Sequence, residues 1–375
     1  MEMVGDGIGA ASGEIWKRQR KFTLTTFRNL GVRQASFESM IITECHEIIK
    51  EITHNANDTF SPKMIFPKAT ANVMCSFVFG RRYNYTDEEF QFLVKSIDRI
   101  EQSRNGIGTL PIFKYLPTRG KLQLRKDLTA LSQFIDNIIE EHKNTFDPEN
   151  PQDYIDIFIK EIQSSGDGLL TNRNLRGTVT LLLFAGVNST SKQLRRAIYC
   201  MLRYPDVQMT VQAELDKVIG RERMPIMSDK ESFPFTMATL LEIQRFGSTA
   251  RFGPLHLASC DVELCGYRIP KGSLLMPNLW AVHHDPKIWS DPEEFKPERF
   301  IARDGKVTRP AELIPFSIGR RTCPGESMAK IRVFIFFTHL LHRFTFIYPE
   351  GAEPLPCVDG AKPIPDFLAT AIPRS

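Results

Sequence analysis

The sequence lacks several patterns that often assign a protein to a class at first sight. No two of its seven cysteines form a Cys-x-x-Cys pair, and an odd count in a chain of 375 residues argues against a disulfide framework or a zinc site. The strongest apolar runs, residues 179–187 and 333–341, fall short of the roughly 18–20 residues that cross a bilayer. We therefore expect a folded protein of a reducing compartment, with most of its cysteines buried.

A strong charge of either sign is also missing. The chain has 48 basic and 44 acidic residues, which leaves a net charge of +4 at pH 7. A surplus this small, without a base-reading motif, argues against a nucleic-acid partner. With 42% hydrophobic and 25% charged residues, the composition is that of an ordinary globular protein.

Helical periodicity is what the sequence has in abundance. It predicts helices over residues 13–53 with a break near 29–31, and over 68–80, 87–104, 121–145, 171–204, 206–219, 236–247 and 325–343. β-Branched residues and turn signals between 250 and 280 predict a small sheet, and a few short strands are expected at the end of the chain. The pattern indicates a mainly α protein, a single domain over residues 1–375 with a small β-sheet subregion.

The longest predicted helix, 171–204, is weak at its centre. Gly186, Asn188, Ser189 and Thr190 are all poor helix formers and follow one another closely. A long buried helix with such a centre predicts a distortion that serves a purpose.

One cysteine stands in an unusual setting. The segment PFSIGRRTCPGESMAK (315–330) places Cys323 just before the predicted helix near Gly325. The unpaired N–H groups of a helix start, together with Arg320 and Arg321, favour a thiolate at this position.

Small and aromatic residues complete this loop. Gly319 and Gly325 allow it to turn tightly and to lie flat against a bulky planar partner, and Phe316 is placed to shield the sulfur. A haem iron bound by a Cys thiolate receives the electron push that favours O–O cleavage. The alternatives are a buried structural cysteine and a nucleophile, but the loop contains no His base. The spacing of these residues around Cys323 and Arg321 favours the iron ligand.

The segment FSIGRRTCPG resembles the cysteine loop of the haem-thiolate monooxygenases, the cytochrome P-450 superfamily, at every fixed position of that pattern. LLEIQRF (240–246) and FKPERF (295–300) resemble two further family segments in the expected order. The likeness extends over essentially the whole chain and is greatest to microsomal members related to vertebrate family two. It implies the P-450 fold, a large helical domain with a small β-sheet subregion, and haem b with Cys323 as the ligand of its iron.

The resemblance also implies an activity. Such proteins insert one atom of dioxygen into a lipophilic molecule, such as a fatty acid, a steroid or a foreign compound, with electrons from NADPH through a flavoprotein reductase. They reside at the cytoplasmic face of the endoplasmic reticulum membrane. Two alternatives stay open: a rearrangement or isomerisation on the same haem without a reductase, and a haem-binding protein or fragment without turnover.

Family members usually begin with a membrane anchor, early helices and the first sheet strands. The sequence shows none of these patterns before the segment that leads to Trp16. We therefore expect a fragment that lacks the usual amino-terminal part.

The resemblance assigns three charged residues to one network. Taken alone, Glu242 and Arg245 at spacing three would be a solvated surface pair worth about 0.3 kcal/mol. In the family they form a buried network with the arginine of the PERF segment, here Arg299, and this network helps to hold the cysteine loop.

Other residues are assigned to the haem propionates. Trp16 and Arg20 lie at spacing four, on one face of a predicted helix, and the family uses such a pair against a propionate. The alternative is a core Trp beside a surface Arg. The resemblance adds Arg321 and His256 to the same task.

The centre of helix 171–204 is expected to face dioxygen. Ala185 and Gly186 fit the family pattern, in which small residues open a groove for a diatomic ligand and a substrate carbon. The next positions usually read acid-Thr, and here they are Asn188 and Ser189, followed by Thr190. Asn188 cannot titrate, so a proton relay through water and a hydroxyl is expected, and packing residues are the alternative.

The substrate pocket is expected to use residues from three segments. These are Phe184, the stretch 249–255 and the turn 359–364, with Thr249, Phe252, Leu255 and Ile364 as the named contacts.

Three other patterns do not change this interpretation. Residues 5–10 (GDGIGA) imitate a dinucleotide motif, but no strand precedes them. The run 283–285 (HHD) could suggest a metal, but it is expected to pack beside the PERF segment. Lys17, Arg18 and Lys21 are either a solvated face or, by resemblance, part of a basic surface for the reductase.

Overall fold

The computed structural model describes residues 7–32, 35–54, 59–104, 119–247, 250–353, 355 and 364–374. The chain divides into two compact units. Unit 1 comprises Met1–Ala56, Phe60–Leu194 and Ser327–Phe336, and unit 2 comprises Asn57–Thr59, Arg195–Glu326 and Phe337–Ser375.

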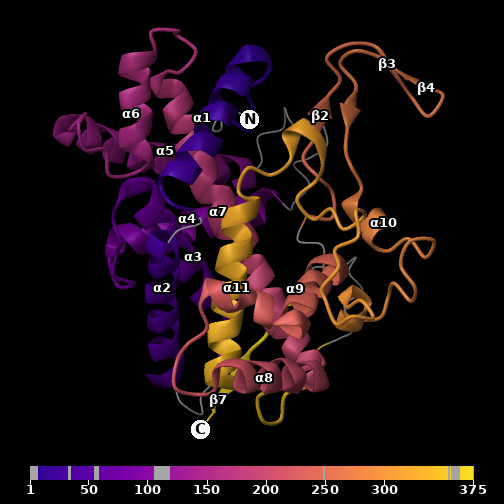
Figure 1. Ribbon diagram of the computed structural model, residues 1–375. Coiled ribbons are helices and arrows are strands. Elements are labelled where there is room, and N and C mark those ends of the chain that lie inside the picture. The colour runs from indigo at the N-terminus through magenta and orange to yellow at the C-terminus, as the bar shows by residue number, and fades with distance from the viewer. Residues whose placement is uncertain are drawn as a thin grey trace. The chain divides into compact units, whose positions relative to one another are not determined.

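Unit 1 is built from helices. They are α1 (Gly13–Asn29), α2 (Ala35–His54), α3 (Pro62–Phe79), α4 (Glu88–Arg104), α5 (Arg119–Thr145), α6 (Tyr154–Ser165), most of α7 (Asn172–Arg203) and part of α11 (Glu326–Arg343) (Figure 1). The helices predicted between 13 and 145 are confirmed, including the break near 29–31, although α3 begins earlier than predicted. Helix α6 lies outside the predicted ranges.

Local chemistry explains where these helices begin and end. Helix α3 has Pro62 in its first turn, where a missing N–H costs nothing, and it ends at Gly80, whose φ of 62° suits only glycine comfortably. Helix α6 begins after Asp153, whose carboxylate accepts from the backbone N–H of Asp156 at 3.0 Å. Aliphatic and aromatic side chains together form the core of unit 1, with Phe22 and Phe158 in edge contact at 4.8 Å between centroids.

Unit 2 combines helices with short strands. Its helices are α8 (Pro205–Ile219), α9 (Pro234–Gly247), α10 (Leu279–His283), the single-turn helices η3 (Met227–Ser232), η4 (Pro297–Phe300) and η5 (Gly319–Arg321), and the remaining parts of α7 and α11. The helices predicted over 206–219, 236–247 and 325–343 are confirmed.

The strands are short and antiparallel. Strand β2 (His256–Leu257) pairs with β5 (Leu274–Leu275), and β3 (Val262–Leu264) pairs with β4 (Tyr267–Ile269), so the small sheet predicted over 250–280 is two separate pairs. Near the end of the chain β6 (Phe344–Ile347) pairs with β7 (Ala369–Pro373), and β1 (Thr59–Phe60) completes the order β1-β7-β6. The fold is mainly α, as predicted.

The longest helix, α7, continues through the weak centre without a break. Within the helix, Ser189 Oγ donates to the carbonyl of Ala185 at 2.7 Å, and Ser191 Oγ donates to that of Asn188 at 3.2 Å. Such bonds compete with the backbone pattern, yet the helix continues through them. Neither α7 nor any other described helix combines the length and the apolar character needed to cross a membrane.

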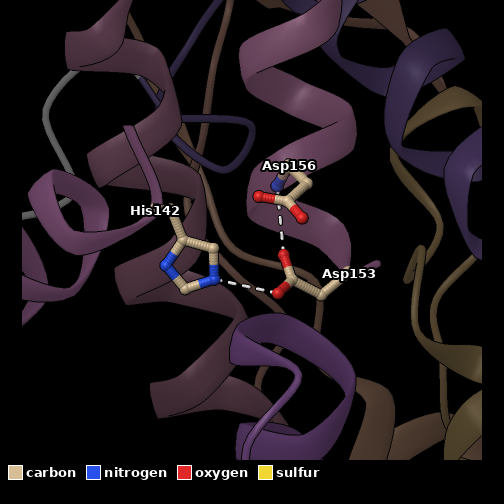
Figure 2. Close-up of side chains that lie close together, drawn as sticks. All are labelled: His142, Asp153 and Asp156. Atoms are coloured by element: carbon tan, nitrogen blue, oxygen red, sulfur yellow. Dashed lines mark hydrogen bonds and ion pairs between the residues drawn. The ribbon is translucent and has the colours of Figure 1, made fainter. Parts of the chain in front are cut away.

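A buried histidine joins α5 to the start of α6 (Figure 2). His142 Nδ1 lies 2.8 Å from the carbonyl of Ile138, and Nε2 lies 2.8 Å from a carboxylate oxygen of Asp153. Both partners are acceptors, so the ring makes both bonds only when both nitrogens carry a proton. Burial alone lowers the pKa of His142, but the hydrogen bond and charge of Asp153 outweigh it, and the pKa is raised above 6.5.

This pair predicts a pH dependence of stability. Because the folded-state pKa of His142 is raised, its contribution is fully present below pH 6.5 and is lost as the pH rises through the folded value. A His142→Gln variant should lose about 1–3 kcal/mol at low pH, and less at high pH. Urea unfolding at a series of pH values measures this, and His54→Gln, an exposed histidine of the same unit, is the control. An equal loss at every pH would contradict the charged pair.

Candidate functional site

The cysteine predicted as ligand lies in a tight loop of unit 2, between η5 and α11. The backbone N–H of Cys323 donates to the carbonyl of Phe316 at 3.0 Å, which closes the loop. Gly319 has a φ of +77°, and a Cβ there would meet no atom within 4 Å. The backbone conformation, not crowding, therefore requires this glycine.

The side chain of Cys323 is exposed beside the first turn of α11. Gly325 is the N-cap of that helix, and a Cβ on it would lie 3.8 Å from the Cys323 sulfur. A glycine here leaves that flank of the sulfur open. The N–H groups of the helix start add partial positive charge nearby, which favours a thiolate.

Three other described cysteines are buried and do not stand open to a ligand as Cys323 does. Cys45, Cys75 and Cys200 are buried, and burial raises the pKa of each thiol, to about 12 for Cys200. Two more are exposed but stand beside the short strand β3. Cys323 is therefore the described cysteine that is both exposed and placed next to a helix start.

Glu242, Arg245 and Arg299 form one buried network in unit 2. Arg245 binds the Glu242 carboxylate with two parallel bonds, 2.7 Å from Nε and 2.8 Å from Nη2, and both side chains are fully buried. Arg299 Nε donates to the same carboxylate at 3.2 Å, and so does the backbone N–H of Lys296 at 2.8 Å. This carboxylate thus fixes α9 to η4.

The remaining donors of Arg245 reach backbone carbonyls. Its Nη1 donates to His283 and Pro292, both at 2.9 Å, and its Nη2 donates to Glu294 at 3.1 Å. Together with the two bonds to Glu242, this uses all five N–H groups of the guanidinium. The buried charge is therefore fully hydrogen-bonded.

Trp16 and Arg20 lie together on α1, in unit 1. The guanidinium carbon of Arg20 is 5.8 Å from the centroid of the Trp16 ring, and Trp16 is buried. The contact is a cation–π pair. In unit 2, Arg321 ends η5, and His256 lies in β2 opposite Leu275.

One face of α7 is open at its centre. Ala185 and Ser189, one helical turn apart, are exposed, whereas Phe184 and Thr190 are buried. Gly186 has a packing role in addition, because a Cβ there would lie 2.7 Å from the sulfur of Met74 in α3. Of the two small residues, Ala185 lies on the exposed face of α7, and Gly186 allows α3 to pack closely against α7.

Two polar atoms on the buried side of this motif have no hydrogen-bond partner among the described residues. They are Asn188 Nδ2 and Thr190 Oγ1. Buried polar groups normally find a partner, which is often an ordered water. The centre of α7 therefore has two buried polar atoms that are available to a further hydrogen-bonding partner.

The residues predicted for the substrate pocket differ in their surroundings. Phe184 is buried in unit 1. In unit 2, Phe252 and Leu255 are 52% and 56% exposed, and Ile364 is half-buried. Thr249 and most of the turn 359–364 lie outside the described residues.

Sequence reasoning missed two arginines that contact these segments. Arg332 directly precedes the apolar run 333–341 in α11, is 2% exposed, and donates to the carbonyl of Gly186 at 2.9 Å. Arg195 in α7 donates to the carbonyl of Ile364 at 3.3 Å and to Asp366 at 2.7 Å. Neither arginine stands inside an apolar run, so the sequence carried no clear local signal for these contacts.

The patterns set aside earlier have structural explanations. A Cβ on Gly7 would lie 2.5 Å from the backbone of Gly177, so this glycine permits close packing on α7. Lys17 pairs with Glu14 at 2.5 Å, and Arg18 pairs with Asp167 at 2.8 Å and with Glu161. Two of the three cations proposed for a basic surface therefore have acidic partners.

Donor chemistry and space around the cysteine loop fit a haem. The sulfur is exposed next to a glycine, and Ile318 in the same loop is 67% exposed, which suits a flat apolar partner. A single cysteine thiolate is a sufficient protein ligand for haem iron. A mainly α fold with this loop and the buried Glu-Arg-Arg network is the combination that the resemblance to haem-thiolate proteins predicts.

The cytochrome P450 family model matches residues 3–369. Cytochrome P450 2J3 of Rattus norvegicus is 37% identical over 357 residues, covering 93% of this chain and 71% of the relative. Cytochrome P450 2U1 of the same organism is 37% identical over 355 residues, covering 92% and 67%. Vitamin D(3) 25-hydroxylase of Sus scrofa is 37% identical over 363 residues, covering 94% and 72%. The chain belongs to the cytochrome P450 family and is an oxidoreductase of the monooxygenase class.

Proposed function

We propose that the chain inserts one atom of dioxygen into a lipophilic organic substrate, with electrons from NADPH delivered by a flavoprotein reductase. The observation that carries this proposal is the exposed thiol of Cys323 at the start of α11. Family membership implies haem, dioxygen and a redox partner. The finer statement, the choice of reductase and substrate, rests on resemblance to microsomal members, as does a location at the endoplasmic reticulum membrane.

In this proposal units 1 and 2 belong to one haem-thiolate domain. Cys323 holds the iron and Phe316 covers the sulfur, while Gly319 and Gly325 keep the loop flat. When bound, the haem supplies the electron transfer and oxygen activation that side chains cannot perform. The propionate contacts are proposed for Trp16, Arg20, Arg321 and His256.

In this proposal the residues at the centre of α7 deliver the protons that the reaction consumes. Ser189 Oγ donates to the carbonyl of Ala185, and its lone pairs remain able to accept from water. Asn188 Nδ2 and Thr190 Oγ1, without described partners, are placed to hold that water. We propose that a proton moves from water through the Ser189 hydroxyl, with Asn188 orienting the water and not titrating.

Substrate contacts are proposed for Phe184, Phe252, Leu255, Ile364 and Thr249. A pocket lined by apolar groups with few polar anchors accepts fatty acids, steroids or foreign compounds. The proposal therefore names the class of substrate by its lipophilic character.

The test combines a spectrum with turnover. The haem-loaded chain, reduced and exposed to carbon monoxide, should give the strongly red-shifted Soret band of thiolate ligation. With reductase, NADPH and labelled dioxygen, a long-chain fatty acid should acquire one labelled oxygen atom, and omission of any component should reduce product to background.

Other results would favour the alternatives. Product formation without NADPH and dioxygen would indicate a rearrangement on the same haem. A thiolate spectrum without turnover of fatty acid, steroid or foreign probe compounds would indicate a haem-binding protein without catalysis.

A further inference from the structure

His283, from the run 283–285 that was not interpreted as a metal site, contacts both the buried Glu242–Arg245–Arg299 network and the segment that leads to Cys323. His283 is the last residue of α10 and is fully buried in unit 2. Its carbonyl accepts from Arg245 Nη1 at 2.9 Å, and its Nε2 lies 3.0 Å from the backbone nitrogen of Ile314. One residue thus contacts both features.

The second contact has a defined direction. The Ile314 N–H can only donate, so Nε2 of His283 accepts and the ring proton sits on Nδ1. Burial, with smaller effects of His284 and Arg245, lowers the pKa of His283 to about 4. The ring is therefore neutral at pH 7, the state in which it can accept.

Ile314 begins the segment that carries the iron ligand. Its carbonyl accepts from the N–H of Ser317 at 2.9 Å, and two residues further on the carbonyl of Phe316 accepts from the N–H of Cys323 at 3.0 Å. Ser317 has a positive φ of 64°, so this turn has a conformation that a non-glycine residue rarely adopts. The hydrogen bond from the Ile314 N–H to His283, a residue outside the turn, therefore limits the other backbone conformations that the turn could adopt.

We propose that His283 is a positioning residue for the thiolate ligand: its Nε2 anchors Ile314 and so fixes the loop that presents Cys323. This inference rests on the proposed function, because it takes Cys323 as the ligand. His283 connects the Glu242–Arg245 network to the loop, because its carbonyl accepts from Arg245 and its Nε2 accepts from the Ile314 N–H.

The test compares three variants of the haem-loaded full chain. His283→Leu leaves the buried N–H of Ile314 without an acceptor, and His283→Gln offers an amide oxygen in place of Nε2. The matched control is His284→Gln, the neighbouring histidine, whose ring stacks on Trp280 at 4.6 Å.

The first readout is the carbon monoxide difference spectrum after reduction. The ratio of thiolate-ligated haem to haem that has lost the sulfur should fall about tenfold in His283→Leu, the factor expected for a buried unsatisfied amide. His283→Gln should restore most of the ratio, and the control should match the unmodified chain. A ratio in His283→Leu equal to that of the unmodified chain would overturn the proposal.

The second readout, on the same samples, does not depend on the haem spectrum. Hydrogen–deuterium exchange in peptides covering residues 313–323 should be about tenfold faster in His283→Leu than in the unmodified chain, and close to normal in His283→Gln. Unchanged exchange would overturn the anchor even if the spectrum changed. If the unmodified chain shows no thiolate spectrum, the proposed function fails, whereas the exchange result still decides whether His283 holds the loop.

Discussion

Cys323→Ser is expected to abolish the strongly red-shifted carbon monoxide band of the reduced, haem-loaded chain. A serine oxygen is a poor donor to haem iron, and the electron push of the thiolate is lost with the sulfur. The substitution is nearly isosteric and the side chain is exposed, so folding should be retained. Monooxygenase turnover should fall to background in the same sample.

The matched control is Cys260→Ser, a second exposed cysteine of unit 2. It should keep both the band and turnover, because Cys260 lies beside β3 and not at a helix start. A red-shifted band in Cys323→Ser, or its loss in Cys260→Ser, would show that another residue is the ligand.

Much of the fold could be predicted from the sequence because helix signals are local. The 3.6-residue period and the breakers near Gly31, Gly80 and Pro205 determine most boundaries within a few residues. Strands β2 and β5 are only two residues each, too short for an alternating pattern to define them. Their pairing depends on contacts distant in sequence, which explains why two strand pairs were expected as one sheet.

The loop around Cys323 was recognisable because its residues are close together in sequence. The contact of Arg332 with Gly186 joins residues 146 positions apart, and no local pattern reports it. Nor does any local pattern report the contact of Met74 with Gly186, in which the Met74 sulfur occupies the space that a side chain at position 186 would need. Sequence reasoning assigned Gly186 to an oxygen groove, and only the packing of α3 shows its second role.

The unbroken centre of α7 illustrates the limit of helix propensity. Ser189 and Ser191 weaken a helix in isolation, since their hydroxyls compete for backbone groups. Here the hydroxyls do bond carbonyls of the same helix, and the helix nevertheless continues. Helix α3 packs on this stretch, with Thr70 Oγ1 3.3 Å from the carbonyl of Val187 and Met74 against Gly186. Such packing overrides a local preference that is worth less than about 1 kcal/mol per residue.

Arg245→Met is expected to destabilise the chain by about 3–5 kcal/mol, the cost of removing one partner from a buried ion pair. The variant leaves Glu242 fully buried, with Arg299 and the Lys296 N–H as its remaining partners among the described residues. It also removes the donors to the carbonyls of His283 and other residues, so the cysteine loop should lose support. Urea unfolding followed by circular dichroism measures the loss.

The same measurement separates this network from ordinary surface charge. Arg268→Met, which breaks an exposed pair with Asp261 at 2.9 Å, should cost less than about 1 kcal/mol. The double variant Glu242→Gln with Arg245→Met should lose clearly less than the sum of the two single variants, because the charges of Glu242 and Arg245 are then removed together and neither is left buried without the other. Additive losses would contradict a coupled network, and a small loss in Arg245→Met alone would show that water enters and solvates Glu242.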